Sequence, residues 1–230
     1  MSPFPRMHRK LPPGRLGPAR IEHFSVTRAD VLASELAIMA EEPLWDKRLT
    51  PGRYARLWVG KHMMMADTHP ERVSCLEVVR QARGHVLIAG LGLGMILWPI
   101  AAKRGVTSIT VLERYRSVVR LVQPHIPARV RVVTTDVFRY RPRRKYDTIW
   151  LDIWPTISVA NLLDMLRLED RYQAHLAPGG WLASWQRPVC EAMAKQKLHD
   201  DAYAALMGNC GAGVQVPKII LPKRGHNVYT

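Results

Sequence analysis

The amino-acid sequence predicts an α/β fold built on a doubly wound parallel sheet. Short apolar runs without polar alternation recur through the middle of the chain, and a segment with helical spacing follows most of them. Strands that are buried on both faces have this character, because helices cover the two sides of a parallel sheet. Glycines or acids stand where four of these runs end, which indicates a binding site along one edge of the sheet.

The expected strands and helices alternate regularly from residue 68 onward. Thr68-His69-Pro70-Glu71 has the spacing of a capping box and predicts a helix that reaches about Ala82. The five expected strands cover Val86–Ala89, Ser108–Leu112, Arg131–Thr134, Tyr146–Leu151 and Trp181–Trp185. The expected helices cover Met95–Arg104, Arg116–Val122, Val159–His175 and Pro188–Met207. A closing strand is expected over Val214–Leu221.

Two segments precede the sheet domain. Residues 1–20 contain five prolines, five lysines or arginines and no acid, which predicts a flexible basic arm. Such an arm could bind a polyanion, pack on a partner subunit or remain a loose terminus. Residues 21–70 predict a small β-rich extension, with one helix over 30–41 and strands between 53 and 65. Residues 71–230 form the third segment, a Rossmann-like domain.

The chain is strongly basic, with 34 Lys and Arg against 19 Asp and Glu and a formal net charge of +15. This charge would attract nucleic acid or another polyanion, although a solvated basic surface explains it equally. No apolar run has the length to span a bilayer and no signal peptide is recognisable, so a cytoplasmic protein away from the membrane is expected. Cys75, Cys190 and Cys210 lie far apart, which fits a reducing compartment and gives no zinc-ligand spacing.

The segment HVLIAGLGLG, residues 85–94, joins an expected strand to a helix through three glycines. Gly90, Gly92 and Gly94 allow the backbone to approach a ligand closely, since they carry no Cβ. The next strand ends at Glu113, whose carboxylate can accept two hydrogen bonds from a ribose diol. A strand, a glycine turn and a helix, followed by a strand that ends in an acid, form the pattern of a nucleoside-cofactor site.

Two further strand ends carry acids, Asp136 after the third strand and Asp152 after the fourth. Parallel strands end at one edge of their sheet, and ligands bind there where the strand order reverses. Asp136 could instead cap a helix, and Asp152 could brace its own loop. The four ends in succession favour one shared ligand site over four unrelated turns.

The same segments resemble those of class I S-adenosylmethionine-dependent methyltransferases, over about residues 71–207 and most closely in the spermidine-synthase-like branch. The similar segments are VLIAGLGLG, VLER, VVTTDVF, YDTIWLDIWP, LAPGGWLASW and, upstream, MMMADTHPER. The resemblance implies the class I methyltransferase fold, S-adenosyl-L-methionine (SAM) as cofactor, and no metal. It also implies that the N-terminal strands could pair across a homodimer.

The resemblance assigns roles to individual residues. The implied cofactor-binding residues are Gly90, Leu91, Gly92, Gly94, Glu113, Arg114, Asp136, Val137 and Asp152. Glu113 would hold the ribose and Asp136 the adenine side, while Asp152 would be the catalytic residue, as a base or as an anchor for the sulfonium or the acceptor. Asp67, Trp154 and Trp185 are the expected substrate-binding residues, although core packing explains the two tryptophans equally.

The chain departs from the aminopropyltransferases of that branch after the fourth expected strand. Those enzymes carry an Asp-x-x-Asp-Pro loop, whereas this loop reads Asp152-Ile153-Trp154-Pro155 and lacks the second acid. A chain with a charge of +15 and one such acid is a poor host for a polycation. The leading hypothesis is therefore methyl transfer to an unknown acceptor. The alternatives are aminopropyl transfer from decarboxylated SAM, and a non-catalytic module that binds nucleic acid or a protein partner.

Overall fold

The structure is a computed structural model of the 230-residue chain, and it describes residues 2–41 and 48–208. The chain divides into two compact units, residues 1–193 and 194–230. The first unit contains both sheets and every described helix up to the start of α7 (Arg187–Gly208). The described part of the second unit is the remainder of α7.

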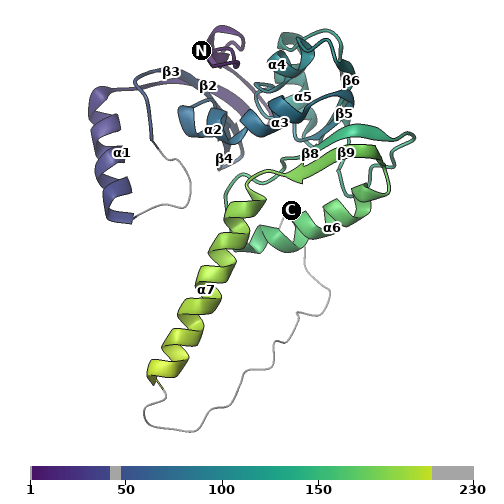
Figure 1. Ribbon diagram of the computed structural model, residues 1–230. Coiled ribbons are helices and arrows are strands. Elements are labelled where there is room, and N and C mark those ends of the chain that lie inside the picture. Colours follow the sequence, from purple (N-terminus) through teal and green to yellow (C-terminus); the bar gives the residue numbers. More distant parts are fainter. Residues whose placement is uncertain (1, 42–47, 209–230) are drawn as a thin grey trace. The chain divides into compact units, whose positions relative to one another are not determined.

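Five parallel strands form the central sheet (Figure 1), in the order β7-β6-β5-β8-β9. The strands are β5 (Gly84–Ala89), β6 (Val106–Glu113), β7 (Val130–Thr134), β8 (Tyr146–Leu151) and β9 (Leu176–Ser184). The chain winds outward from β5 to β7, then returns to place β8 on the other side of β5. The order therefore reverses between β5 and β8, which confirms the predicted doubly wound α/β class and locates its ligand-binding edge.

Short helices lead into the central sheet or connect its strands. They are α2 (His69–Ser74), α3 (Leu76–Gln81), α4 (Leu97–Ala101), α5 (Arg116–Val122) and α6 (Leu162–Gln173), with single 3-10 turns at Gln123–His125 and Val159–Asn161. The helix expected up to Ala82 is in fact α2 and α3, because Cys75 leaves the helical region with ψ near 1°. No helix within the described ranges has the length and apolar character to cross a membrane. The strand expected over 214–221 lies outside the described residues.

A second, antiparallel sheet precedes the central one and forms the expected β-rich extension. It has the order β1-β2-β3-β4, with β1 (Gly14–Leu16), β2 (Ala19–Val26), β3 (Gly52–Val59) and β4 (His62–Ala66), and α1 (Arg28–Glu41) joins β2 to β3. Ile21 and Leu57 of this sheet belong to the same buried cluster as Ile88 of β5 and Val118 of α5. The extension and the central sheet therefore share one hydrophobic core.

The first twenty residues are not the flexible arm that their composition predicts. Phe4, Met7 and Leu11 are buried in the shared core, and the segment forms a 3-10 turn (Met7–Arg9) before β1. The Met7 N–H also donates to the Asp67 carboxylate at 2.8 Å. Prolines and charged residues dominate the composition of this segment. Its buried apolar residues Phe4, Met7 and Leu11 are nevertheless spaced at i, i+3 and i+7, so that they pack along one side of the core.

Removing the Met7 side chain should therefore destabilise the protein. Met7 has no exposed surface, so Met7→Ala is expected to lower the free energy of unfolding by about 2–5 kcal/mol. Its exposed neighbour Arg9 provides the matched control, and Arg9→Ala should stay within about 0.5 kcal/mol of the parent. Urea denaturation of the three proteins measures the difference. Equal midpoints for Met7→Ala and the parent would show that the segment is not docked.

Candidate functional site

The glycine-rich loop begins at Gly90, where β5 ends beside β8. Gly90 has a φ of 100°, and a Cβ placed on it would lie 1.9 Å from the carbonyl oxygen of Asp152. The Asp152 N–H in turn donates to the carbonyl of Ala89 at 2.9 Å. A side chain at position 90 would be strained by the backbone angle and would overlap the next strand. Glycine at this position therefore allows the loop and Asp152 to meet at the point where the strand order reverses.

Glu113 connects the glycine loop to the end of β6. Its buried carboxylate accepts a hydrogen bond from the Leu91 N–H at 3.1 Å and from the Tyr115 N–H at 2.7 Å. Burial raises the pKa of Glu113 above its ordinary value, and the backbone donors partly offset this effect. Each carboxylate oxygen can accept more than one hydrogen bond, so Glu113 can hold the loop and still bind ligand hydroxyls.

The other expected cofactor-binding residues near Glu113 differ in their surroundings. Arg114 is exposed, with its guanidinium 5.8 Å from the centroid of the Tyr115 ring. Asp136 holds its own turn, since its Oδ1 accepts from the Phe138 N–H at 2.8 Å, as in the capping alternative. Val137 is buried in the core. The Thr135 N–H donates to the carbonyl of Glu113 at 2.8 Å, which places the end of β7 next to Glu113.

Met65 of β4 lies against the glycine loop. The Leu93 N–H donates to the Met65 sulfur at 3.0 Å, and a Cβ on Gly92 would lie 2.2 Å from the same atom. Gly92 and Gly94 both have positive φ angles, 52° and 71°. The N-terminal extension therefore contributes a soft, polarisable side chain to the wall of the site.

A second carboxylate, which the sequence did not indicate, lies near Asp152. Burial raises the pKa of Asp152 to about 7, and the nearby Trp150 indole partly offsets this effect. Burial is also the largest cause that raises the pKa of Glu71, in α2, to about 8, and the negative charge of Asp152 adds to it. The buried Cys75 thiol is close to both acids, and its pKa is raised well above the ordinary value by burial and then by their charges.

Glu71 and Asp152 titrate in sequence as a coupled pair. Asp152 ionises first, while Glu71 is neutral, so burial alone explains the upward shift of its pKa. Glu71 then ionises beside an existing charge, which raises its pKa further. Near neutral pH the pair holds at least one exchangeable proton, so it can give or take a proton from a bound molecule. No group of three His, Cys, Asp or Glu side chains within the described ranges could hold a metal ion.

The capping box is the reason why Glu71 was overlooked. Thr68 does stand at the N-cap of α2 and Pro70 at its start, but the Thr68 side chain makes no capping hydrogen bond. The expected reciprocal pair with Glu71 is therefore absent, and Glu71 faces a cavity instead. Local sequence does not distinguish a capping glutamate from one that lines a cavity, because its partner Asp152 lies far along the chain.

The cavity beside Glu71 has a volume of about 370 Å³. It is lined by Pro70, Glu71, Ser74, Pro155, Thr156, Ile157, Trp185 and Gln186. The Trp185 indole N–H donates to the Ser74 hydroxyl at 2.9 Å, which fixes the ring at the cavity wall. Gln186 has a φ of 53°, an uncommon value for a residue other than glycine. Trp185 follows β9 and lines this cavity, but it also belongs to a buried core cluster, so its expected contact with an acceptor stays a prediction.

The structure does not place Asp67 and Trp154 at this cavity. Asp67 is fully buried, and its carboxylate accepts hydrogen bonds from the N–H groups of Met7 and Ala55. The same carboxylate forms an ion pair with Arg72. Trp154 is buried in the core cluster that contains Cys190. The expectation of substrate contact fails for both side chains because the protein itself surrounds them. For Trp154 this is the core packing that the sequence left open.

No family model matches the chain, and a comparison with curated proteins also found no match. A comparison with solved structures matched half of the chain. DhpI in its SAM–HEP complex is 18% identical, with 50% of this chain and 54% of that chain covered and a TM-score of 0.39. SAM-bound CalS10, an amino pentose methyltransferase from Micromonospora echinaspora involved in calicheamicin biosynthesis, is 24% identical, with coverages of 50% and 49% and a TM-score of 0.40.

The N-methyltransferase NodS from Bradyrhizobium japonicum, in complex with S-adenosylhomocysteine, is 18% identical. The match covers 50% of this chain and 60% of that chain, with a TM-score of 0.39. The matched part spans about half the length of the first of these solved structures. The likeness is therefore partial, and the function of the protein must be argued from its own residues.

Gly90→Ala should disrupt the junction between the loop and β8. The added Cβ overlaps the Asp152 carbonyl, so we expect a loss of about 1–3 kcal/mol in the free energy of unfolding. Gly105→Ala is the matched control, because no atom lies within 4 Å of its added Cβ and its stability should change by less than about 0.5 kcal/mol. Thermal or urea unfolding measures both. An equal effect of the two substitutions would contradict the close approach at Gly90.

Glu71→Gln should stabilise the protein more as the pH rises. The folded-state pKa of Glu71 is raised to about 8 from an ordinary 4.5, so the wild-type protein loses stability as the pH rises between these values. The glutamine variant has no such loss. We expect equal melting temperatures near pH 4.5 and a variant about 10–20 °C more stable above pH 8, because ionising a carboxyl whose pKa lies at about 8 rather than 4.5 costs about 5 kcal/mol.

Glu77→Gln provides the matched control for this pH profile. Hydrogen bonds from Gln81 and Arg80 lower the pKa of Glu77, so its replacement should give no gain at high pH. Differential scanning calorimetry from pH 4.5 to 9 follows all three proteins. A difference between Glu71→Gln and the parent that does not vary with pH would show that Glu71 ionises normally.

Proposed function

We propose that the protein is a SAM-dependent methyltransferase whose donor binds at the carboxyl ends of β5 and β6. One observation carries this proposal: the buried Glu113 carboxylate holds the Leu91 N–H of a glycine loop at the point where the strand order reverses. An acid that both organises such a loop and keeps acceptor capacity is suited to a ribose.

The residues present fit such a donor. Gly90, Gly92 and Gly94 adopt positive φ angles that favour glycine, and Glu113 can accept hydrogen bonds from a diol. Asp136 uses Oδ1 in its turn, so it is a weaker candidate for the adenine side than Glu113 is for the ribose. When bound, SAM supplies a methyl group on a positively charged sulfur. The protein itself must hold the acceptor next to that group and remove the acceptor's proton.

The cavity lined by Glu71 and Trp185 supports an amine as the acceptor. Glu71 lines this cavity, and a carboxyl whose pKa lies near 8, with Asp152 close by, can exchange a proton with a bound amine at neutral pH. The Trp185 ring adds an aromatic surface that attracts a cation. A cavity of about 370 Å³ is near the lower end of the roughly 300–1,000 Å³ range for small-molecule sites, which favours a small acceptor.

Glu71 also supports a second candidate, aminopropyl transfer from decarboxylated SAM. The loop after β8 lacks one of the two acids of that branch, but Glu71 places a second carboxylate near Asp152 from a different element. The identity of the donor distinguishes the two candidates, because one retains the methionyl carboxylate and the other lacks it.

Calorimetric titration with SAM, S-adenosylhomocysteine and decarboxylated SAM tests both candidates. For a methyltransferase we expect micromolar binding of the first two ligands, and at least a tenfold loss in Glu113→Gln, which removes the charge but keeps the size. Glu77→Gln, which changes an acid on α3 that is bonded to Gln81 and Arg80, should bind as the parent does. Melting temperatures of the variants show whether each one is folded.

Preference for decarboxylated SAM would select aminopropyl transfer instead. Methyl transfer from labelled SAM to small amines, compared with alcohols of matched size, then tests the acceptor class. Label on alcohols alone would contradict the role given to the two carboxylates. Failure of all three ligands to bind the folded protein would refute both enzymatic functions and favour a non-catalytic module.

A further inference from the structure

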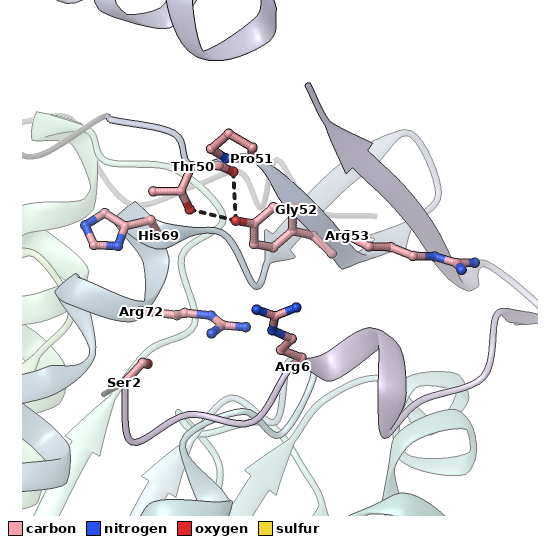
Figure 2. Close-up of a pocket in the computed structure, with 9 residues that line it drawn as sticks. Ser2, Arg6, Thr50, Pro51, Gly52, Arg53, His69 and Arg72 are labelled. Atoms are coloured by element: carbon pink, nitrogen blue, oxygen red, sulfur yellow. Dashed lines mark hydrogen bonds between the residues drawn. The ribbon is translucent and has the colours of Figure 1, made fainter. Parts of the chain in front are cut away.

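A second cavity, with a volume of about 230 Å³, lies among the 3-10 turn, β3 and α2 (Figure 2). Its lining includes Arg6, Arg53 and Arg72, together with His69 and Tyr54, and no aspartate or glutamate. The guanidinium groups of Arg6 and Arg72 point toward each other in Figure 2. Like charges that face each other are unfavourable unless an anion lies between them.

Arg72 is a fixed donor at this cavity. Its Nε donates to the Asp67 carbonyl at 2.8 Å, and its Nη2 donates to the Asp67 carboxylate at 2.9 Å and to the Pro5 carbonyl at 3.2 Å. Asp67 is fully buried, so this arrangement orients the guanidinium rigidly and offsets its charge. Nη1 makes none of these contacts and can donate to a bound anion.

Arg6 and Arg53 supply the uncompensated charge. Both side chains are exposed, and within residues 2–41 and 48–208 neither guanidinium forms a hydrogen bond or an ion pair. Burial lowers the pKa of His8 in the neighbouring 3-10 turn, and the positive charge of Arg53 lowers it further. The cavity therefore has one oriented arginine and two arginines whose charge is not neutralised by the described residues.

We propose that this cavity binds the phosphate group of a small molecule. The guanidinium groups of Arg6 and Arg72 come from different segments of the chain and face each other, which suits a tetrahedral oxyanion held between them, while Arg53 points away from them in Figure 2 and adds only its nearby positive charge. A planar carboxylate would be satisfied by a single guanidinium fork. The volume lies below the roughly 300–1,000 Å³ of sites for drug-sized ligands, so the group that enters is small.

The phosphate cavity is separate from the cavity proposed for the acceptor. Arg72 and His69 face this cavity from α2, whereas Glu71 and Ser74 of the same helix line the cavity near Asp152. Phosphate binding can therefore be measured without SAM or an acceptor. Loss of one property does not decide the other.

Calorimetric titration with inorganic phosphate, at constant ionic strength, tests this assignment. We expect one phosphate per chain, with at least tenfold weaker binding in Arg6→Gln and a smaller loss in Arg53→Gln, because the Arg53 guanidinium points away from the other two in Figure 2. Arg72 is left unchanged, because its contacts with Asp67 stabilise the fold. Arg139→Gln is the matched control, since Arg139 is exposed and does not line the cavity, and it should bind phosphate as the parent does.

Three results would overturn the proposal. The first is the absence of saturable phosphate binding to the folded parent protein. The second is equal weakening in Arg139→Gln, which would indicate only the diffuse attraction of a basic surface. The third is tight binding of a single-stranded oligonucleotide that depends on Arg6 and Arg53 while free phosphate does not bind. That result would assign the arginines to a nucleic-acid backbone instead.

Discussion

The close approach between Gly90 and the Asp152 carbonyl determines how the site is assembled. Backbone hydrogen bonds continue one residue beyond the strands, from the Gly90 N–H to Leu112 and from the Asp152 N–H to Ala89. These bonds hold three neighbouring strand ends together, so the first residue of the loop has little freedom. A Cβ at position 90 would push this junction apart, and with it the relative placement of Glu113 and Asp152.

The strands and their functional ends could be predicted from sequence because their signals are local. Tyr146–Leu151 and Arg116–Val122 match β8 and α5 residue for residue, since an apolar run or a helical stripe identifies each one. Glu113 was recognisable because an acid directly ends an apolar strand. The topology rule then placed these ends at one edge of the sheet without any knowledge of side-chain contacts.

The contacts that escaped prediction join residues far apart in the chain. Asp67 binds the Met7 N–H across 60 positions, so neither residue carries a local sign of the partner that orders the first segment. Glu71 has the spacing of a capping residue, and only the folded chain brings it near Asp152. Burial raises the cost of ionising both acids, and the charge of Asp152 raises it further for Glu71, so the pair does not stabilise the folded state at neutral pH. Such perturbed groups are concentrated at functional sites.

Helix α2 links the two cavities, and its own stability depends on tertiary contacts. A helix of six residues is too short to persist alone in water, so packing and anchoring must hold it. The bonds of Arg72 to Asp67 provide that anchor, and Asp67 is itself held by the backbone of β3 and of the N-terminal turn. The same contacts that orient Arg72 toward one cavity therefore fix where Glu71 stands in the other. Docking of the first residues thus contributes to the geometry of the carboxylate pair, although none of them lies beside it.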